Sequence, residues 1–339
     1  MYFVFKFHSY IYLYMKKILM TNFAGLNLNS PIIIGSSGLT NTPEKNTALE
    51  KAGAGALILP SIFEEQIELQ MNKDIWTDCP KARNYILNST YEMQLEDYLK
   101  LISDSKELCH IPIIASINCY RENGWIDFVR RIETAGADAI ELNVYGLNTE
   151  IDQLENSIED IYLRITQKVK SLVNIPVIVK MSKYFSHIVK LTNDLQKTGA
   201  DGIVLFSRFY QPDIDVHLMQ ANSGYVFSSN AEIADALRWT FFVSSKLPDI
   251  SIASCTGIHD WEDIVKCILC GASSVEVCST VYENGNEIIQ AMNRSIEEWM
   301  VTKDFKSIEE IKGKINFGEI QDPSLHERIQ FMKYFANRD

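Results

Sequence analysis

The chain has 339 residues, of which 46% are hydrophobic and 22% charged, as in a globular protein with a large core. Its formal net charge of −12 disfavours nucleic-acid binding, which requires a basic face. Its seven cysteines are an odd number in a long chain without a secretory leader, which predicts reduced thiols in the cytoplasm. This length suits a single α/β barrel with insertions.

The first 14 residues, MYFVFKFHSYIYLY, are unusually aromatic. Charged residues interrupt the run, which is too short to span a bilayer, and two lysines follow it in the wrong order for a signal peptide. We expect residues 1–19 to be an extension, 20–320 a barrel domain and 321–339 a C-terminal tail. Translation from Met15 or Met20 is one hypothesis for the extension, and anchoring to a surface is the alternative.

From residue 31 the chain repeats a short apolar run, a polar loop and an amphipathic helical stretch. The apolar runs are β-branched and nearly continuous, as strands covered on both faces must be. Eight strands are therefore predicted, at residues 32–36, 56–60, 113–117, 139–143, 177–181, 202–206, 250–254 and 274–278.

Helical patterns separate these runs. The first, residues 42–54, begins with Thr42 as N-cap and Pro43 at the first helical position. Small-residue turns containing glycine (AGA, AGAD, TGAD and CGA) precede strands two, four, six and eight, and indicate where helices end. Further helices are predicted at residues 91–109, 124–138 and 185–201.

Eight strands alternating with helices at this length predict a (β/α)₈ barrel. A doubly wound sheet is the alternative, but GSSGLTN after the first strand lacks the G-x-G-x-x-G loop typical of that fold. Long insertions are predicted after strand two, at residues 61–112, and after strand six, at residues 207–229. A cover for the active site is expected in the first of them.

Polar residues follow the predicted strands at their C-terminal ends, which carry the active site in such barrels. Lys180 interrupts the apolar strand VIVKM, and we interpret it as a fixed cation beside a bound ring or anion rather than a lysine extending to solvent. Asn143 ends AIELN and offers a donor and an acceptor to a heterocycle, unless it serves loop backbone. The other candidates at these ends are Ser36, Ser37, Gly38, Asn118, Ser207, Arg208, Thr256, Gly257, Cys278 and Ser279.

Two loops, SCTGIHDWED and CSTVYENG, follow strands seven and eight, the usual phosphate position in these barrels. Small residues let backbone N–H groups approach phosphate oxygens, and a following helix adds its dipole. We predict phosphate binding there, with ordinary turns as the alternative. Cys267 and Cys270 form an isolated C-x-x-C, which we interpret as two small residues in a helix, and no metal site is predicted.

These motifs resemble the class 1 dihydroorotate dehydrogenases, and more closely their dehydrogenase-like relatives, over roughly residues 23–317. SPIIIGSSGLT is similar to the family's opening strand and its turn on FMN. IPVIVKM resembles the strand with the flavin-contacting lysine, which implies that role for Lys180. ELNVYGLN resembles the family's E-L-N-x-S-C-P-N and implies flavin or substrate contacts at Asn143 and Asn148.

The last quarter of the barrel, SCTGIHDWEDIVKCILCGASSVEVCSTVYENG, resembles the family's phosphate half. The resemblance implies substrate contacts at Asn88, Asn148 and Arg208. It implies FMN contacts at Ser36, Ser37, Gly38, Asn118, Asn143, Lys180, Ser207, Thr256, Gly257, Cys278 and Ser279.

The sequence departs from the family at chemically important positions. The family's Cys or Ser base corresponds to Gly146, its second lysine to Pro60, and an asparagine near the end of strand six to Ser207. Tyr145, Arg208 and Tyr210 are the candidates that could compensate. Arginine stays protonated, so we interpret Arg208 as a clamp for a substrate carboxylate.

The resemblance thus implies a cytoplasmic FMN-dependent oxidoreductase acting on a CH–CH bond. Lys180, Asn143, Arg208 and Tyr145 are its expected catalytic residues. Its reaction would be dihydroorotate to orotate in pyrimidine biosynthesis, or a related oxidation with an altered, dihydropyrimidine-like substrate. A homodimer without nucleic-acid or membrane partners is expected. The alternatives are a flavin-free phosphate-binding barrel enzyme and a catalytically silent flavin-binding protein.

Overall fold

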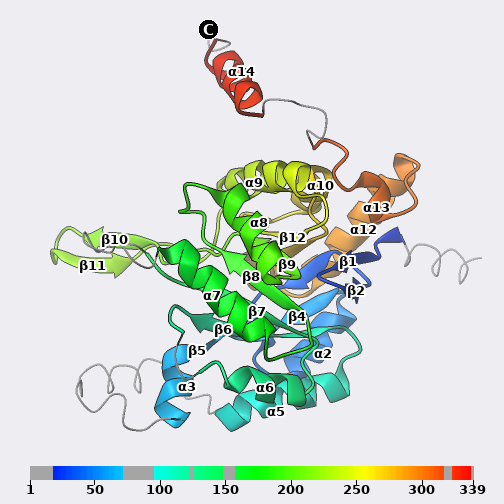
Figure 1. The fold of residues 1–339 in the computed structure, drawn as a ribbon. Helices are drawn as coiled ribbons and strands as arrows, with labels where there is room; N and C mark the ends of the chain where they lie inside the picture. Colours follow the sequence, from blue (N-terminus) through cyan, green and yellow to red (C-terminus); the bar gives the residue numbers. More distant parts are fainter. Residues whose placement is uncertain (1–17, 72–94, 123–124, 148–156, 317–322, 337–339) are drawn as a thin grey trace, which may run out of the picture.

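The computed structural model describes residues 18–71, 95–122, 125–147, 157–316 and 323–336. Eight parallel strands form a closed barrel surrounded by helices (Figure 1). Pairing of β4 with β6 closes the ring, which confirms the predicted barrel and excludes the doubly wound sheet. In ring order the strands are β3 (Ile32–Ile34), β4 (Ala56–Ile58), β6 (Ile113–Cys119), β7 (Ala139–Val144), β8 (Val177–Met181), β9 (Gly202–Leu205), β12 (Ser251–Cys255) and β13 (Ser274–Val277).

The interior of the barrel is apolar at its N-terminal end. Small and β-branched residues of alternate strand positions fill it, including Ile33, Ile178 and Val204. A β-hairpin, β1 (Thr21–Phe23) and β2 (Leu26–Leu28), packs Phe23 onto this cluster. This hairpin, which the sequence did not predict, covers one end of the barrel and leaves the C-terminal end for ligands.

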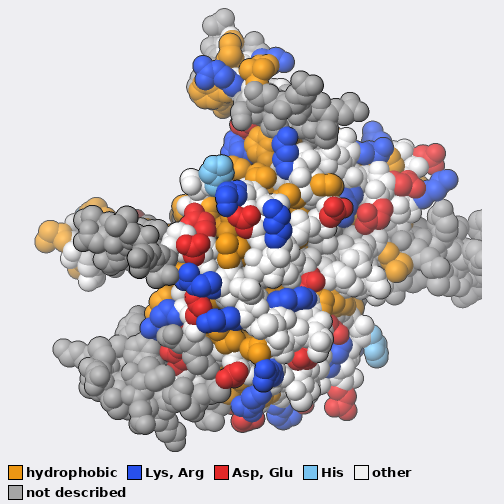
Figure 2. All heavy atoms as spheres, in the orientation of Figure 1, with side chains coloured by type: hydrophobic (Ala, Val, Ile, Leu, Met, Phe, Trp, Pro, Cys, Tyr) orange, Lys and Arg blue, Asp and Glu red, His pale blue; other side chains and the backbone are white. Residues whose placement is uncertain are grey.

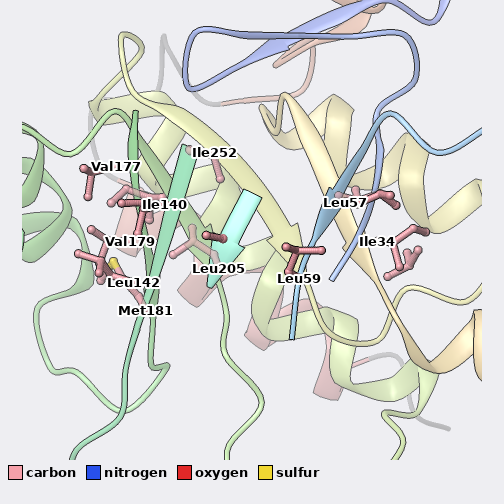
Figure 3. Packing of buried hydrophobic residues seen from close by; sticks show 14 of the residues in the cluster. Ile34, Leu57, Leu59, Ile140, Leu142, Val177, Val179, Met181, Leu205 and Ile252 are labelled. Carbon is pink, nitrogen blue, oxygen red and sulfur yellow. The ribbon is translucent and has the colours of Figure 1, made fainter. Parts of the chain in front are cut away.

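The outer face of the strands packs against the helices. Figure 3 shows side chains such as Ile34, Leu142 and Val179 in this buried layer, and each buried side chain of this size contributes about 1.5–3 kcal/mol. The surrounding helices are α2 (Pro43–Lys51), α5 (Leu95–Leu108), α6 (Phe128–Thr134), α7 (Ile158–Lys170), α8 (Ile188–Thr198), α9 (Ile233–Lys246), α10 (Trp261–Cys270) and α12 (Glu287–Thr302). Shorter elements are α3 (Glu64–Met71), α11 (Ser279–Asn284) and α13 (Ile308–Ile311).

Local sequence signals set the ends of these helices. The hydroxyl oxygen of Thr42 accepts a hydrogen bond from the Lys45 N–H, and Pro43 opens α2, both as predicted. The glycines of the four small-residue turns have φ between +98° and +116°, which a residue with a side chain rarely adopts. Cys267 and Cys270 are free, buried residues of α10, which confirms their structural interpretation.

The long segments after β4 and β9 contribute extra elements. The first contains β5 (Ile62–Phe63), α3 and α5, and the predicted substrate residue Asn88 lies outside the described residues. The second contains the β10 (Pro212–Asp215)–β11 (Gln220–Ser223) hairpin, which extends away from the barrel (Figure 1), and a 3₁₀ turn, Asn230–Glu232. Hydrophobic side chains lie at the tip of the hairpin (Figure 2), where Met219 is 87% exposed.

The chain ends bear on the predicted domain boundaries. Ile18 and Leu19 are buried in the main core, whereas residues 1–17 lie outside the described part, so the extension remains a prediction. Within the predicted tail, α14 (Pro323–Ala336) is described. Among the described residues, no helix has both the length and the apolar character needed to cross a membrane.

Candidate active site

A cavity of about 210 Å³ opens at the C-terminal end of the barrel. Its walls include most of the polar residues predicted from the sequence: Ser36, Asn143, Lys180, Ser207, Arg208, Thr256, Gly257, Cys278 and Ser279. Ser37, Gly38, Asn118 and Tyr145 do not line it, and Asn148 lies outside the described residues. The convergence follows from the fold, because parallel strands bring their C-terminal ends to one rim.

The register of three neighbouring strands places polar side chains at one level. Asn143 of β7 pairs with Asn118 of β6 on one side and with Lys180 of β8 on the other. The Oγ atom of Ser207 donates a hydrogen bond of 3.0 Å to Oδ1 of Asn143. Ser207 therefore orients the amide that the sequence predicted to serve a ligand.

Lys180 is buried, with 8% of its surface exposed, and lies between two acidic residues. Its Nζ atom donates a short hydrogen bond to Oε2 of Glu276 on β13 and lies 3.6 Å from Oε1 of Glu141 on β7. Both glutamates are almost fully buried. The predicted fixed cation is thus present, but it is paired with carboxylates of the barrel itself.

Burial and charge act against each other in this cluster. Burial alone would lower the pKa of Lys180, but the two glutamates reverse that effect and hold the pKa well above its usual value. Burial raises the pKa of Glu141 well above its usual value, and the neighbouring Glu276 raises it further despite the opposing charge of Lys180. The ammonium group therefore stays charged, and Glu141 favours its protonated form.

A chain of hydroxyl groups begins in the cavity wall, at Ser36 and Ser61, and leads to β6. The Oγ atoms of Ser36 and Ser61 are 3.0 Å apart, and those of Ser61 and Ser116 are 2.8 Å apart. Ser116 lies opposite Glu141 in the register of β6 and β7. These serines give this side of the cavity rotatable donors and acceptors.

The loops after β12 and β13 form another part of the cavity wall. The backbone N–H groups of Gly257, Ile258 and Ser279 make no hydrogen bond within the described part of the chain. Ser228 packs beside them, and its N–H and Oγ groups donate to Oγ of Ser279 at 3.0 and 3.2 Å. Free backbone donors beside hydroxyl groups suit an anionic group such as a phosphate.

The sequence predicted that the helix after β12 would add its dipole to a phosphate site in these loops. The hydrogen bonds at the start of that helix do not favour this contribution. At the start of α10, the Asp260 carboxylate accepts from the Asp263 N–H, and the Asp263 carboxylate accepts from the N–H groups of His259 and Asp260. These carboxylates already satisfy the N-terminus of α10 and offset its positive end. Phosphate binding here would depend on the loop backbone rather than on α10.

Gly257 is required by close packing of its loop. Its φ is +79°, and a Cβ atom at this position would lie 2.2 Å from the backbone nitrogen of Ile233 at the start of α9. We expect Gly257→Ala to lower the free energy of unfolding by about 1–3 kcal/mol, because strained backbone and overpacking both apply. Urea unfolding checks this, with Gly25→Ala as control, since that glycine also has positive φ but no atom within 4 Å of the added Cβ. A loss no larger than that of Gly25→Ala would contradict the packing explanation.

Arg208 is held by its own surroundings. Its Nε atom donates to Glu232 at 2.9 Å, and one terminal nitrogen donates to the carbonyl oxygens of Tyr225 and Val226, each at 2.9 Å. These bonds tie the loop at residues 225–228 to the rim of the cavity. The predicted role of Arg208 as a carboxylate clamp stays a prediction.

The loop after β7 contains Tyr145 and Gly146. The Tyr145 ring stacks on Phe209 with 4.1 Å between ring centroids, and its N–H donates to the carbonyl of Cys119. A Cβ atom on Gly146 would make ordinary contacts with Ile158, the nearest at 3.7 Å. A side chain therefore fits at the position where the resembling family has its base.

Sequence reasoning missed Glu141, Glu276, Ser61 and Ser228. A signal for the two glutamates existed, because each is a lone acidic residue inside an apolar strand, in AIELN and SVEVC. The same reasoning had singled out Lys180. The serines carried no such signal, since serine is common in loops.

Comparison with known proteins agrees with this architecture. A family model described as dihydroorotate dehydrogenase matches residues 18–300. The catalytic subunit of dihydroorotate dehydrogenase B (NAD(+)) from Pyrococcus furiosus is 29% identical over 301 residues, which cover 85% of this chain and 96% of that relative. The corresponding subunit from Methanosarcina mazei is 28% identical over 312 residues, with 88% and 95% covered.

A relative named for a different activity also matches. The NAD-dependent dihydropyrimidine dehydrogenase subunit PreA of Escherichia coli is 23% identical over 325 residues, which cover 89% of this chain and 78% of that relative. The family match spans most of the chain, and these relatives are all dehydrogenases. The chain therefore belongs to the dihydroorotate dehydrogenase family and is an oxidoreductase of that type.

Proposed function

We propose that the protein is an FMN-dependent oxidoreductase that oxidises a CH–CH bond in a dihydropyrimidine-like substrate. The observation that carries this proposal is the cavity at the C-terminal end of the barrel. One side of it offers Lys180 and Asn143, and the other offers the free backbone N–H groups of the Gly257 and Ser279 loops. This polarity suits a heterocycle at one end and a phosphate at the other.

The residues present are compatible with FMN. One buried carboxylate oxygen of Glu276, a residue that lines the cavity, has no hydrogen-bond partner in the described structure, so polar capacity is left there for a bound molecule. Lys180 and Asn143 would hold the ring, and Thr256, Gly257, Ser228 and Ser279 would hold the phosphate. When bound, FMN supplies a hydride acceptor, which no side chain can provide.

The reaction also requires a proton to be removed from the substrate. Oxidation of a CH–CH bond removes a hydride from one carbon and a proton from its neighbour, and a positioned base contributes roughly 10²–10⁴ in rate to the second step. The position of that base in the resembling family corresponds to Gly146, which carries no side chain. We therefore propose either slow oxidation of dihydroorotate to orotate, as in pyrimidine biosynthesis, or a related substrate with a more acidic C–H group.

Anaerobic reduction of the bound flavin tests this proposal. The protein would be mixed with dihydroorotate, dihydrouracil and dihydrothymine, and the bleaching of the flavin absorbance followed. Fumarate and NAD⁺, which occur in the names of related dihydroorotate dehydrogenases, would then be tried as acceptors. Reduction by one dihydropyrimidine and reoxidation by an acceptor is the expected result. A bound flavin that dithionite reduces but no dihydropyrimidine reduces would instead favour a silent flavoprotein.

Arg208, which lines the cavity, is proposed to contact a substrate carboxylate. We expect Arg208→Leu to raise the KM of an acidic dihydropyrimidine about 10- to 100-fold, since a hydrogen bond to a charged group contributes about 1.5–3 kcal/mol. Glu232→Gln is the matched control, because it breaks the ion pair but keeps the guanidinium. Equal rises in KM for acidic and neutral substrates, in both variants, would show that Arg208 only holds the loop.

A cytoplasmic homodimer completes the proposal. The exposed apolar side chains of the β10–β11 hairpin, including Val216, Leu218 and Met219, support self-association, because monomers rarely expose such patches. Sedimentation velocity measures the mass directly. A monomeric mass at micromolar concentration would contradict the dimer without affecting the catalytic proposal.

A further inference from the structure

Three strands bring one basic and two acidic side chains together at the base of the cavity. Lys180 comes from β8, Glu141 from its neighbour β7, and Glu276 from β13, farther around the ring. All three are at least nine-tenths buried, and both Lys180 and Glu276 line the cavity. Both carboxylate oxygens of Glu141 and one of Glu276 lack a hydrogen-bond partner within the described structure.

The charges of this cluster do not balance if every group is ionised. Two carboxylates and one ammonium group would leave one uncompensated negative charge in a buried site, which is costly. The nearby thiols add no further negative charge, because burial raises the pKa of Cys255 to about 12 and that of Cys278 to about 11, so both are neutral at pH 7. A proton on one carboxyl group removes the imbalance.

We propose that Glu141 and Glu276 hold a single proton between them at neutral pH, so that the ammonium group of Lys180 presents no net charge to a bound molecule. Glu276, which makes the closer contact, fixes the direction of the ammonium group. Glu141, at 3.6 Å, carries the proton, consistent with the upward shift of its pKa. Lys180 then acts as a positioned hydrogen-bond donor rather than as a free cation, and Glu276 is its positioning residue.

This arrangement has an unusual consequence for substitutions. In Glu276→Gln, Glu141 loses its acidic neighbour, ionises and pairs with Lys180, so the cluster stays neutral. In Glu141→Gln, the pair of Lys180 with Glu276 remains, so the cluster again stays neutral. Only the double variant leaves the ammonium group uncompensated. If instead both carboxylates were ionised in the wild type, each single substitution would change the net charge by one.

The protonation itself can be tested on the apoprotein by infrared difference spectroscopy at pH 7. Subtracting the Glu141→Gln spectrum from that of the wild type is expected to show one C=O stretching band of a protonated carboxylic acid. The same band is expected in the difference with Glu276→Gln, because Glu141 ionises there. Absence of the band from either difference spectrum overturns the shared proton.

The effect on a bound ring rests on the proposed function and uses FMN as the probe. In both single variants, the ratio of affinities for reduced and oxidised FMN should stay within about threefold of the wild type. The double variant Glu141→Gln/Glu276→Gln removes both carboxylates that keep Lys180 protonated. At a pH low enough for the ammonium group to persist, this variant should raise the ratio at least tenfold, because an uncompensated cation favours the anionic reduced ring, and tenfold corresponds to a midpoint potential about 30 mV higher.

The infrared spectra and the FMN affinity ratios test different parts of the proposal. Stepwise changes in the FMN ratio with each single variant, or a folded double variant whose ratio is unchanged even at acid pH, overturn the neutral cluster. If the double variant does not fold, the infrared spectra and the single variants still decide. If no FMN binds to the wild type, the proposed function fails, whereas the apoprotein spectra still test the shared proton.

Discussion

Lys180→Met is expected to lower the free energy of unfolding by about 3–5 kcal/mol at pH 7 and to abolish FMN retention. The reason is that removing one partner of a buried ionic cluster leaves the other charges uncompensated. Here Glu141 and Glu276 would remain buried without their cation. Urea unfolding monitored by circular dichroism measures the loss of stability.

The sign of the pH dependence follows from the carboxyl groups. Burial raises the pKa of Glu141 above its unfolded value of about 4.3, and losing Lys180 raises it further. A raised pKa gives stability that is present below the unfolded pKa and lost as the pH rises through the folded pKa. Without Lys180, the one negative charge of the Glu141–Glu276 pair is buried alone, and acid removes that charge, so the deficit of Lys180→Met should be smallest near pH 4 and grow towards pH 7.

A surface lysine provides the control for this variant. Lys183 pairs with Asp235 at 2.8 Å, but both side chains are about 40% exposed, and such pairs contribute less than about 1 kcal/mol. Lys183→Met should retain FMN and nearly all of the stability. If Lys180→Met were as stable as Lys183→Met at pH 7, the buried cluster would not have the role assigned to it.

Gly146→Cys is expected to raise dihydroorotate turnover by about 10²–10⁴-fold, the contribution typical of a positioned base. Among the described residues, the nearest atom to an added Cβ is 3.7 Å away, on Ile158, so these residues leave space for the side chain. Stopped-flow measurement of flavin reduction isolates this step. Because the thiolate is the base, the gain should increase with pH until the thiol is fully ionised.

Gly146→Ala is the matched control, because it fills the same space without a proton acceptor. It should leave turnover unchanged, so a gain in both variants would point to loop rigidity instead of base catalysis. A Gly146→Cys protein that binds dihydroorotate without reacting faster would contradict the assignment of Gly146. Pro60, which stands where the resembling family has a second lysine, would then be the next position to restore.

Much of the fold was predictable because parallel barrel strands have a distinctive pattern. Each of the eight predicted runs overlaps a strand of the ring, and the glycine turns before strands two, four, six and eight have the left-handed backbone expected of helix ends. The β1–β2 hairpin was not predicted, because two three-residue strands carry too little pattern to distinguish them from a loop. Its role in covering the barrel depends on packing, which only the assembled ring shows.

The residues of the candidate site were likewise only partly predictable from the sequence. Polar residues at strand ends, such as Asn143 and Lys180, could be placed on one rim because all the strands run in the same direction. The partners of Lys180 could not be predicted, because Glu276 is 96 residues away and reaches it only through closure of the ring. The acidic cap of α10 was likewise visible only in the hydrogen bonds of Asp260 and Asp263.

The central claim is that the cavity at the C-terminal end of the barrel holds one FMN per chain. Isothermal titration of the flavin-free wild-type protein with FMN, in parallel with Lys180→Met and Gly257→Ala, tests it most directly. We predict a stoichiometry of one for the wild type, with binding weakened by both substitutions, which lie at the ends of different strands, β8 and β12, in the cavity wall. Absence of binding to the folded wild-type protein, or equal binding to all three proteins, would contradict the account.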